Sequence, residues 1–182
     1  MVEEEILPLV INYLEDLTNT VRKTAQTSLV AILEFFSPQV CHQKILPNII
    51  GLAEKQNDDY RTEAVTLLAK LSPILGEEIT RDEVLPKFIA ACNDELFHVR
   101  KVSATHAPDI AKVIGPYETE LKIVPHFAKL SEDVVWGVRK ACADSFASLA
   151  EAVSDEARIN TLSPLFVDLL NDDSRWVRLR LF

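Results

Sequence analysis

The sequence predicts an all-α solenoid, a stack of antiparallel helix pairs, because three residue types recur at one fixed spacing of 39 residues. Self-similarity at a fixed period of about 20 to 50 residues is typical of repeat architectures. The recurring residues are Arg22, Arg61, Arg100, Arg139 and Arg178, then Pro8, Pro47, Pro86, Pro125 and Pro164, then Asp16, Asp94, Asp133 and Asp172. Lys55 stands where the second unit lacks its aspartate. The 182 residues therefore hold about four and a half units, each expected to pack mainly on its neighbours.

The second half of each unit predicts the clearer helix, which we call the B helix. In the fourth unit, apolar residues at Val138, Cys142, Phe146 and Leu149 are three or four positions apart, the spacing of one buried helical stripe. Pro108, in the middle of the third B helix, predicts a local kink. The B helices are expected to end near small residues that leave the helical conformation at little cost, namely Ser37, Gly76, Gly115 and Ser154.

The first half of each unit predicts a second helix, the A helix. Its apolar stripe in the first unit is Ile6, Leu9, Val10 and Tyr13. The recurring proline lies in or near the first turns of every A helix, where it removes a backbone donor, so the A helices are expected to be bent. Short acidic turns join A to B and are expected to cap the B helices. No segment alternates with a period of two for long enough to predict a strand.

The units are expected to form a single array whose boundaries follow the 39-residue spacing. They are residues 1–39, 40–78, 79–117 and 118–156, followed by an incomplete unit at 157–182. Solenoids usually close with a capping unit that has a polar outer face. This sequence instead ends on the apolar residues Trp176, Val177, Leu179, Leu181 and Phe182. We therefore expect the chain to be a fragment of a longer array.

Charge and cysteine content restrict the kind of partner. The formal net charge of −9 and the pI near 4.9 argue against nucleic acid and anionic membranes, which attract basic surfaces. Cys41, Cys92 and Cys142 are an odd number in different units, which predicts neither a disulfide framework nor a zinc site and fits a reducing compartment. No apolar run approaches the roughly 18 residues that predict a membrane span, and the acidic start lacks the basic flank of a signal peptide. We expect a cytoplasmic protein, present also in the nucleus, that binds other proteins.

The sequence carries no recognisable motif for catalysis or cofactor binding. Its four histidines form no HExxH and no HxxxH pair, so no metal site is expected. Neighbouring carboxylates such as Glu77 and Glu78 point about 100° apart on a helix and cannot form an acid–base dyad. The four glycines are isolated and build none of the known phosphate-binding loops. The expected protein is therefore not an enzyme and needs no cofactor.

In four of the five units, an aspartate follows the proline after eight residues, and valine and arginine follow after a further five and six. This pattern on a 39-residue helix pair resembles the HEAT repeat, and the resemblance covers the whole chain. It implies a ladder of hydrogen-bonded charges between neighbouring units, formed by Asp16, Asp94, Asp133 and Asp172 with Arg22, Arg61, Arg100, Arg139 and Arg178. Asp58 and Asp59 are expected to substitute for the aspartate missing at Lys55. Such partly buried, bidentate pairs prevent slippage between units more than they add net stability.

Longer segments carry a closer resemblance. They are DDYRTEAV at 58–65, DELFHVRKVSA at 94–104, EDVVWGVRKACADSF at 132–146 and DDSRWVR at 172–178. These segments resemble the regulatory subunit 1 family of serine/threonine protein phosphatase 4 and, more loosely, the scaffold subunit of protein phosphatase 2A. The resemblance implies a regulatory and scaffold subunit that binds the catalytic subunit of a phosphatase of type 4 or type 2A and recruits protein substrates. It also implies docking on the A–B turns, residues 16–19, 56–59, 95–98, 133–136 and 173–176, which we call the turn ridge.

The turn ridge holds the candidate partner-binding residues Phe97, His98, Trp136, Arg175 and Trp176. A row of aromatic residues along an edge suits a set of anchors for a partner, because buried Trp and Tyr dominate interface energies. In the alternative interpretation, these aromatic residues pack between adjacent units, as aromatic residues at helix starts often do. His98 is then simply an exposed turn residue.

Two rival classes of function remain open. A HEAT-repeat scaffold of another kind, such as a nuclear-transport receptor segment or a tubulin-binding array, is the first. Basic turns would favour tubulin, whereas these turns are acidic. An iron-dependent hydroxylase built on such repeats is the second; it would need His-Glu pairs in successive units, and this sequence has none.

Overall fold

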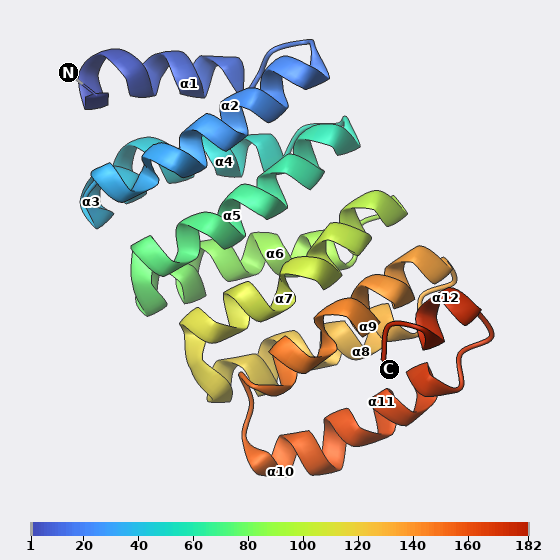
Figure 1. Ribbon diagram of the computed structural model, residues 1–182. Helices are drawn as coiled ribbons and strands as arrows, with labels where there is room; N and C mark the ends of the chain where they lie inside the picture. Colours follow the sequence, from blue (N-terminus) through green and yellow to red (C-terminus); the bar gives the residue numbers. More distant parts are fainter. Residues whose placement is uncertain (1, 182) are drawn as a thin grey trace.

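The computed structural model describes residues 2–181, and within this range the chain is an all-α solenoid without a β-strand. Helix pairs stack in chain order from the N-terminal to the C-terminal end (Figure 1). One layer consists of the B helices, α2 (Asn19–Ile32), α5 (Asp58–Ile79), α7 (Phe97–Glu118), α9 (Trp136–Ala150) and α12 (Arg175–Arg178). The A helices form the other layer, with α1 (Leu7–Tyr13), α3 (Pro38–Val40), α4 (Leu46–Ala53), α6 (Leu85–Cys92), α8 (Val124–Ser131), α10 (Asp155–Ala157) and α11 (Ser163–Leu170).

Every A helix contains a π-helical turn of five residues that ends two residues before the recurring proline. These turns are Val2–Ile6, Cys41–Ile45, Thr80–Val84, Thr119–Ile123 and Arg158–Leu162. Proline donates no backbone hydrogen bond, and its ring clashes with the carbonyl four residues earlier in a regular helix. A turn of wider pitch accommodates both effects. The prolines were predicted to bend the A helices; what the structure shows beside each of them is this π-helical turn.

The four predicted ends of the B helices are confirmed. Gly76 and Gly115 adopt positive φ angles of 81° and 78°, which a residue with a Cβ rarely adopts. Helical geometry resumes directly after each glycine, so the bounds of α5 and α7 extend a few residues further, into the first turn of the next A helix. The buried hydroxyls of Thr80 and Thr119 bridge each break, donating to the carbonyl oxygens of Ser72 and Ala111.

At the other two ends, serine caps the following A helix. Ser37 Oγ accepts a hydrogen bond from the Val40 N–H at 3.3 Å, and Ser154 Oγ accepts one from the Ala157 N–H at 3.2 Å. After α2, the short 3₁₀ turn Leu33–Phe35 precedes this serine. Serine and glycine thus separate the units by different means, one by capping and the other by its positive φ angle.

A kink was predicted at Pro108, but the helical backbone of α7 is not interrupted at this residue. Within α7, the backbone leaves the helical region only at Gly115. Pro108 deprives the carbonyl oxygen of Ala104 of its usual N–H donor, and the buried hydroxyl of Ser145 on α9 donates to that oxygen at 2.8 Å. A side chain of the next unit therefore satisfies the carbonyl, and the helix continues through the proline.

A continuous apolar core runs between the two layers from Leu7 to Val177. Phe127 is 1% exposed and lies with its ring centroid 6.1 Å from that of Phe146, which in turn lies 5.3 Å from Phe166. Cys41, Cys92 and Cys142 are buried without disulfides, and burial raises the pKa of Cys92 to about 12. The end of the apolar C-terminal run, Phe182, lies outside the described residues.

No helix between residues 2 and 181 is both long enough and apolar enough to cross a membrane.

Candidate protein-binding ridge

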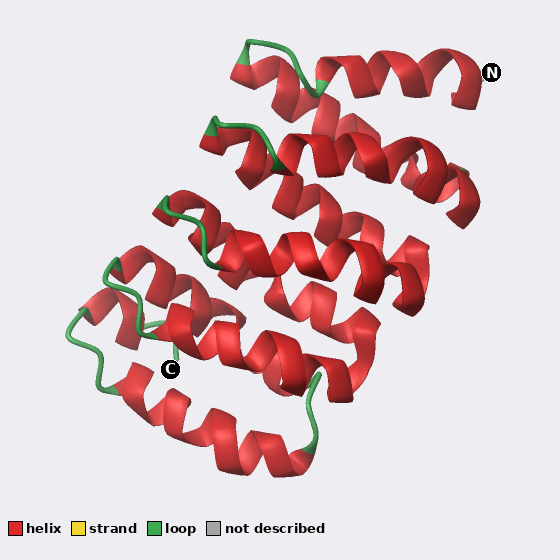
Figure 2. Ribbon diagram, turned by 180° about the vertical axis from the view of Figure 1, so that it is seen from behind, coloured by secondary structure: helices red, strands yellow, loops and turns green. Residues whose placement is uncertain are grey.

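The A–B turns lie along one edge of the stack, where Figure 2 draws them as a row of green loops. In four turns, the recurring aspartate accepts a hydrogen bond from the backbone N–H two residues later, and the donors are Thr18, Leu96, Val135 and Ser174. In the second turn, Asn57 does the same for the N–H of Asp59. Side-chain acceptors of this kind stabilise a turn that leads into a helix. Each B helix therefore starts from a rigid turn.

The arginine of one unit reaches the aspartate of the next, 33 residues later. Arg100 Nε donates to Asp133 Oδ2 at 2.6 Å, and its Nη2 donates to Oδ1 at 3.1 Å. The same bidentate geometry joins Arg61 to Asp94 and Arg139 to Asp172. Bidentate pairs fix direction as well as distance. These three pairs hold the start of each B helix against the turn of the following unit.

The third nitrogen of each arginine supports its own turn. Arg100 Nη1 donates to the carbonyl oxygens of Asp94 at 2.8 Å and Glu95 at 2.9 Å. Arg22, Arg61, Arg139 and Arg178 donate to carbonyl oxygens at the same place in their units. Arg178 makes its described hydrogen bonds only to these carbonyls, at Asp172 and Asp173. One guanidinium thus connects its own turn, its B helix and the next unit.

The first pair of the ladder is built differently, because Lys55 replaces the aspartate. Lys55 forms an ion pair with Glu15 instead, at 2.9 Å. Arg22 is 3% exposed and donates from Nε to both carboxylate oxygens of Glu63 at 3.1 Å, and from Nη2 to Asp59. Its guanidinium carbon also lies 4.6 Å from the ring centroid of Tyr60. Asp59 therefore takes over part of the role of the missing aspartate, but the main acceptor for Arg22 is Glu63.

Glu63 was not among the predicted members of the ladder. Its equivalents in the other units are Thr24, Val102, Ala141 and Arg180, of which Thr24 and Arg180 are exposed. The repeat pattern therefore gave no signal that this position would hold a buried acceptor in the second unit. Burial raises the pKa of Glu63, and the hydrogen bonds and charge of Arg22 offset this only in part.

The aspartates of the regular pairs are held in their ionised form. Partial burial opposes the ionisation of Asp94 and Asp133, but hydrogen bonds from Arg61 or Arg100 and from a backbone N–H outweigh it, so both pKa values are lowered. The hydrogen bond from Arg139 is the main cause of the lowered pKa of Asp172. A carboxyl group with a lowered pKa in the folded state stabilises the fold above its unfolded pKa.

We expect the ladder to make the fold sensitive to acid. Stability from Asp94, Asp133 and Asp172 should be fully present above their ordinary pKa of 3.8 and should be lost as the pH falls through their lower folded values. Urea unfolding at about pH 5 and about pH 2.5 measures this loss. In the variant Asp133→Asn the loss should be smaller, because one titrating carboxyl group is gone. An equal loss in both proteins would contradict the assignment.

The aromatic candidates lie at the first residues of the B helices and remain partly exposed. Phe97 is 37% exposed, Trp136 48% and Trp176 49%. The Phe97 ring stacks on His98 with 3.8 Å between centroids, and the Arg175 guanidinium carbon lies 4.5 Å from the ring centroid of Trp176. These contacts stay within one turn. Each side chain thus keeps enough free surface to contact a partner.

The turn ridge also exposes aliphatic residues that the sequence reasoning did not single out. Leu17 is 94% exposed and Val134 is 91% exposed. They occupy equivalent positions, where the other three turns carry Gln56, Glu95 and Asp173. In the sequence, an apolar residue at a position that is polar in the other units could have indicated this exposed apolar surface. With Trp136 two residues away, Val134 enlarges the exposed apolar surface of the fourth turn.

Among residues 2–181, no three His, Cys, Asp or Glu side chains are grouped so that they could hold a metal ion. The two closest contacts of histidine with a carboxylate are His42 with Glu83 and His106 with Asp109, at 2.7 and 2.8 Å. Each joins a single carboxylate to a single imidazole.

Comparison with known proteins supports the repeat fold. The HEAT repeat family matches residues 123–153, and no curated protein sequence matches the chain. The crystal structure of Cex1p superposes with a TM-score of 0.76 at 16% identity, and the match covers 96% of this chain and 33% of Cex1p. The chain thus spans about one third of the length of that protein. It is a HEAT or armadillo-like repeat protein in fold.

Two further solved structures share this fold. Kap95p, in its structure with RanGDP, superposes with a TM-score of 0.70 at 14% identity, covering 99% of this chain and 25% of Kap95p. A designed armadillo repeat protein in complex with the peptide (KR)4 superposes with a TM-score of 0.62 at 20% identity, covering 96% of this chain and 78% of the designed protein. At these identities the likeness concerns the fold alone.

Proposed function

We propose that this chain is a non-catalytic scaffold that holds a protein partner on its turn ridge. The observation that carries the proposal is the row of partly exposed aromatic side chains, Phe97, Trp136 and Trp176, at the starts of three successive B helices. Because the charge ladder fixes these helix starts, the anchors are ordered before the partner arrives. Preorganisation of this kind reduces the entropy that binding costs.

The partner that we propose is the catalytic subunit of a serine/threonine phosphatase of type 4 or type 2A. Support comes from the resemblance of residues 94–104, 132–146 and 172–178 to regulatory subunit 1 of protein phosphatase 4, since these segments contain all three aromatic anchors. The scaffold would hold catalytic subunit and protein substrate on one surface and so raise their effective concentration. In this proposal, no residue of the chain acts on the phosphate ester.

Capture of purified catalytic subunits tests the proposal directly. The immobilised chain is incubated with the catalytic subunits of protein phosphatases 4, 2A and 1, and the retained protein is measured. We expect the type 4 subunit to be retained most strongly and the type 1 subunit to pass through. Retention of none of the three, at concentrations up to about 10 µM, would remove the phosphatase role.

A nuclear-transport receptor segment is the second candidate. Its support is the likeness of fold to Kap95p and also to Kap121p, whose structure superposes with a TM-score of 0.71 at 21% identity over 97% of this chain and 18% of Kap121p. The same capture experiment therefore includes Ran loaded with GDP or with GTP. Retention of Ran without retention of a phosphatase would favour this candidate over the first.

A further inference from the structure

Three of the nine prolines directly follow a serine, in the dipeptides Ser37-Pro38, Ser72-Pro73 and Ser163-Pro164. Proline-directed serine/threonine kinases act on this dipeptide and transfer a phosphoryl group to the serine hydroxyl. By sequence, the three serines are equivalent candidates for such a kinase. The structure separates them by the exposure of the side chain, by the backbone conformation and by the hydrogen bonds of the hydroxyl group.

Ser37 is exposed and lies in an extended stretch of backbone between a 3₁₀ turn and α3. Its φ and ψ angles are −68° and 155°, and those of Phe36 before it are −105° and 143°. A residue that precedes proline favours this region. A kinase must align the acceptor oxygen with the γ-phosphorus of ATP, which an extended segment permits. For Ser37, only the first turn of the A helix has to open, and helix ends fray at little cost.

The other two serines that precede proline have helical backbones. Ser72 lies within α5 and is 0% exposed. Ser163 is exposed, but its φ and ψ angles are −58° and −45°, and it follows the π-helical turn Arg158–Leu162 without interruption. A kinase could bind either serine in extended form only after several helical hydrogen bonds had opened. Such an opening costs more the deeper it lies in a packed helix.

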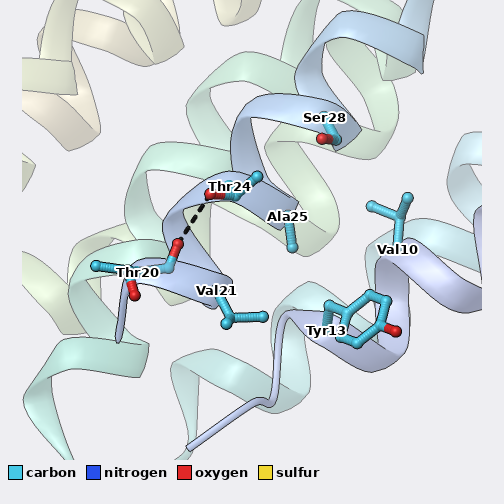
Figure 3. A pocket seen from close by; sticks show the side chains of 7 residues that line it. All are labelled: Val10, Tyr13, Thr20, Val21, Thr24, Ala25 and Ser28. Carbon is cyan, nitrogen blue, oxygen red and sulfur yellow. Dashed lines mark hydrogen bonds between the residues drawn. The ribbon is translucent and has the colours of Figure 1, made fainter. Parts of the chain in front are cut away.

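Many hydroxyl groups within the helices of this chain donate to a carbonyl oxygen of the preceding turn. Figure 3 shows this for Thr24, which lines the cavity between α1 and α2 and donates to the Thr20 carbonyl oxygen at 2.9 Å. Ser72 donates in the same way to Leu68 at 2.7 Å. Ser163 donates to the carbonyl oxygen five residues earlier at 3.0 Å. In both serines, the proton that phosphorylation must remove is already held by the helix.

We propose that Ser37 is a phosphorylation site for a proline-directed serine/threonine kinase. Its Oγ accepts the Val40 N–H at 3.3 Å and donates to no group between residues 2 and 181, so its proton is free to leave. In the transfer, Oγ forms a bond to the γ-phosphorus of ATP, and the bond from that phosphorus to the β–γ bridging oxygen breaks. The hydroxyl proton passes to the catalytic aspartate of the kinase, and ADP leaves.

The phosphate adds about two negative charges to the edge opposite the turn ridge, where B helices lead into A helices. Its oxygens can accept the same Val40 N–H that the hydroxyl oxygen accepts now, so the boundary between the first two units stays folded. The site therefore does not depend on the function proposed for the turn ridge.

Ser154 is a matched control for the role of the proline. It occupies the same place in its unit as Ser37, is exposed, and has φ and ψ angles of −65° and 161°. Its Oγ accepts the Ala157 N–H at 3.2 Å, as Ser37 accepts that of Val40. Asp155 follows it in place of a proline. A proline-directed kinase should therefore distinguish two serines that have nearly the same conformation.

Phosphorylation of the purified chain by a cyclin-dependent kinase and by a mitogen-activated protein kinase, each with ATP, tests the proposal. Mass spectrometry gives the sites and rates, and short unfolded peptides around each serine give the rate that each sequence permits by itself. We expect at least one kinase to modify Ser37 in the folded chain within about tenfold of its peptide rate. Ser72 and Ser163 should be at least about 100-fold slower than their peptides, and Ser154 should stay unmodified.

The variant Pro38→Ala tests the dependence on proline. Alanine is well tolerated in a helix, so the change should keep the helical content measured by circular dichroism, but it should abolish the modification of Ser37. Three results would overturn the proposal. They are a Ser37 peptide that neither kinase accepts, a folded chain in which Ser37 is slowed as strongly as Ser163, and a Pro38→Ala chain that is modified as fast as the original.

Discussion

Replacing Asp133 with alanine is expected to lower the free energy of unfolding by about 3 kcal/mol. The Asp133 side chain is 7% exposed, accepts two hydrogen bonds from Arg100 and caps the Val135 N–H. The change would leave Arg100, itself 16% exposed, without its carboxylate. A charge left largely buried without a partner costs more than the pair gains in net stability. Urea unfolding followed by circular dichroism measures the effect.

The neighbouring Glu132 provides a matched control. It is exposed and forms no ion pair within the described part of the chain, so Glu132→Ala should change the free energy of unfolding by less than about 0.5 kcal/mol. A loss for Asp133→Ala as small as that for Glu132→Ala would contradict a structural role of the ladder. A changed denaturant slope would instead indicate that the units have ceased to unfold together.

Replacing Trp136 with alanine is expected to weaken binding of the captured catalytic subunit by at least about 30-fold, the loss typical of a central aromatic anchor. Trp136 is 48% exposed at the start of α9, two residues from the 91% exposed Val134. Because its ring is not part of the buried core, the same change should leave Tm nearly unaffected. Isothermal titration calorimetry with the purified subunit measures the affinity.

The control for this prediction is Tyr117→Ala. Tyr117 is 75% exposed and follows Gly115 at the opposite edge of the stack, where B helices lead into A helices. Its removal should leave the affinity within about threefold of the original value, because residues outside a contact contribute little to binding. If Tyr117→Ala weakens binding more than Trp136→Ala does, the partner uses the opposite edge.

Much of the fold could be predicted from the sequence, because the spacing of the recurring residues follows from how the helices pack. The 39-residue recurrence of arginine and proline places every helix pair, and small residues at Gly76 and Gly115 give the breaks between units. The all-α solenoid is confirmed. The turn positions of the aromatic candidates follow from the same spacing, since equivalent positions in a solenoid lie along one edge.

Other features depend on contacts between units, which spacing alone does not specify. Glu63 replaces the missing aspartate from the second turn of α5, because the Arg22 side chain is long enough to reach it. Pro108 leaves α7 helical because Ser145, 37 residues away, satisfies the carbonyl that the proline orphans. The exposure of the aromatic side chains on the turn ridge could be learned only from the structure. Residues at the start of a helix can be buried or exposed with the same sequence pattern.

Hydrogen exchange of the chain in complex with its captured partner shows which edge of the stack the partner covers. We expect slower exchange at the A–B turns, residues 94–98, 133–137 and 172–176, with no change at the opposite edge around Ser37, Gly76, Gly115 and Ser154. Protection confined to that opposite edge or to the exposed face of the B helices, with the A–B turns unchanged, would contradict the assignment of the turn ridge as the binding surface.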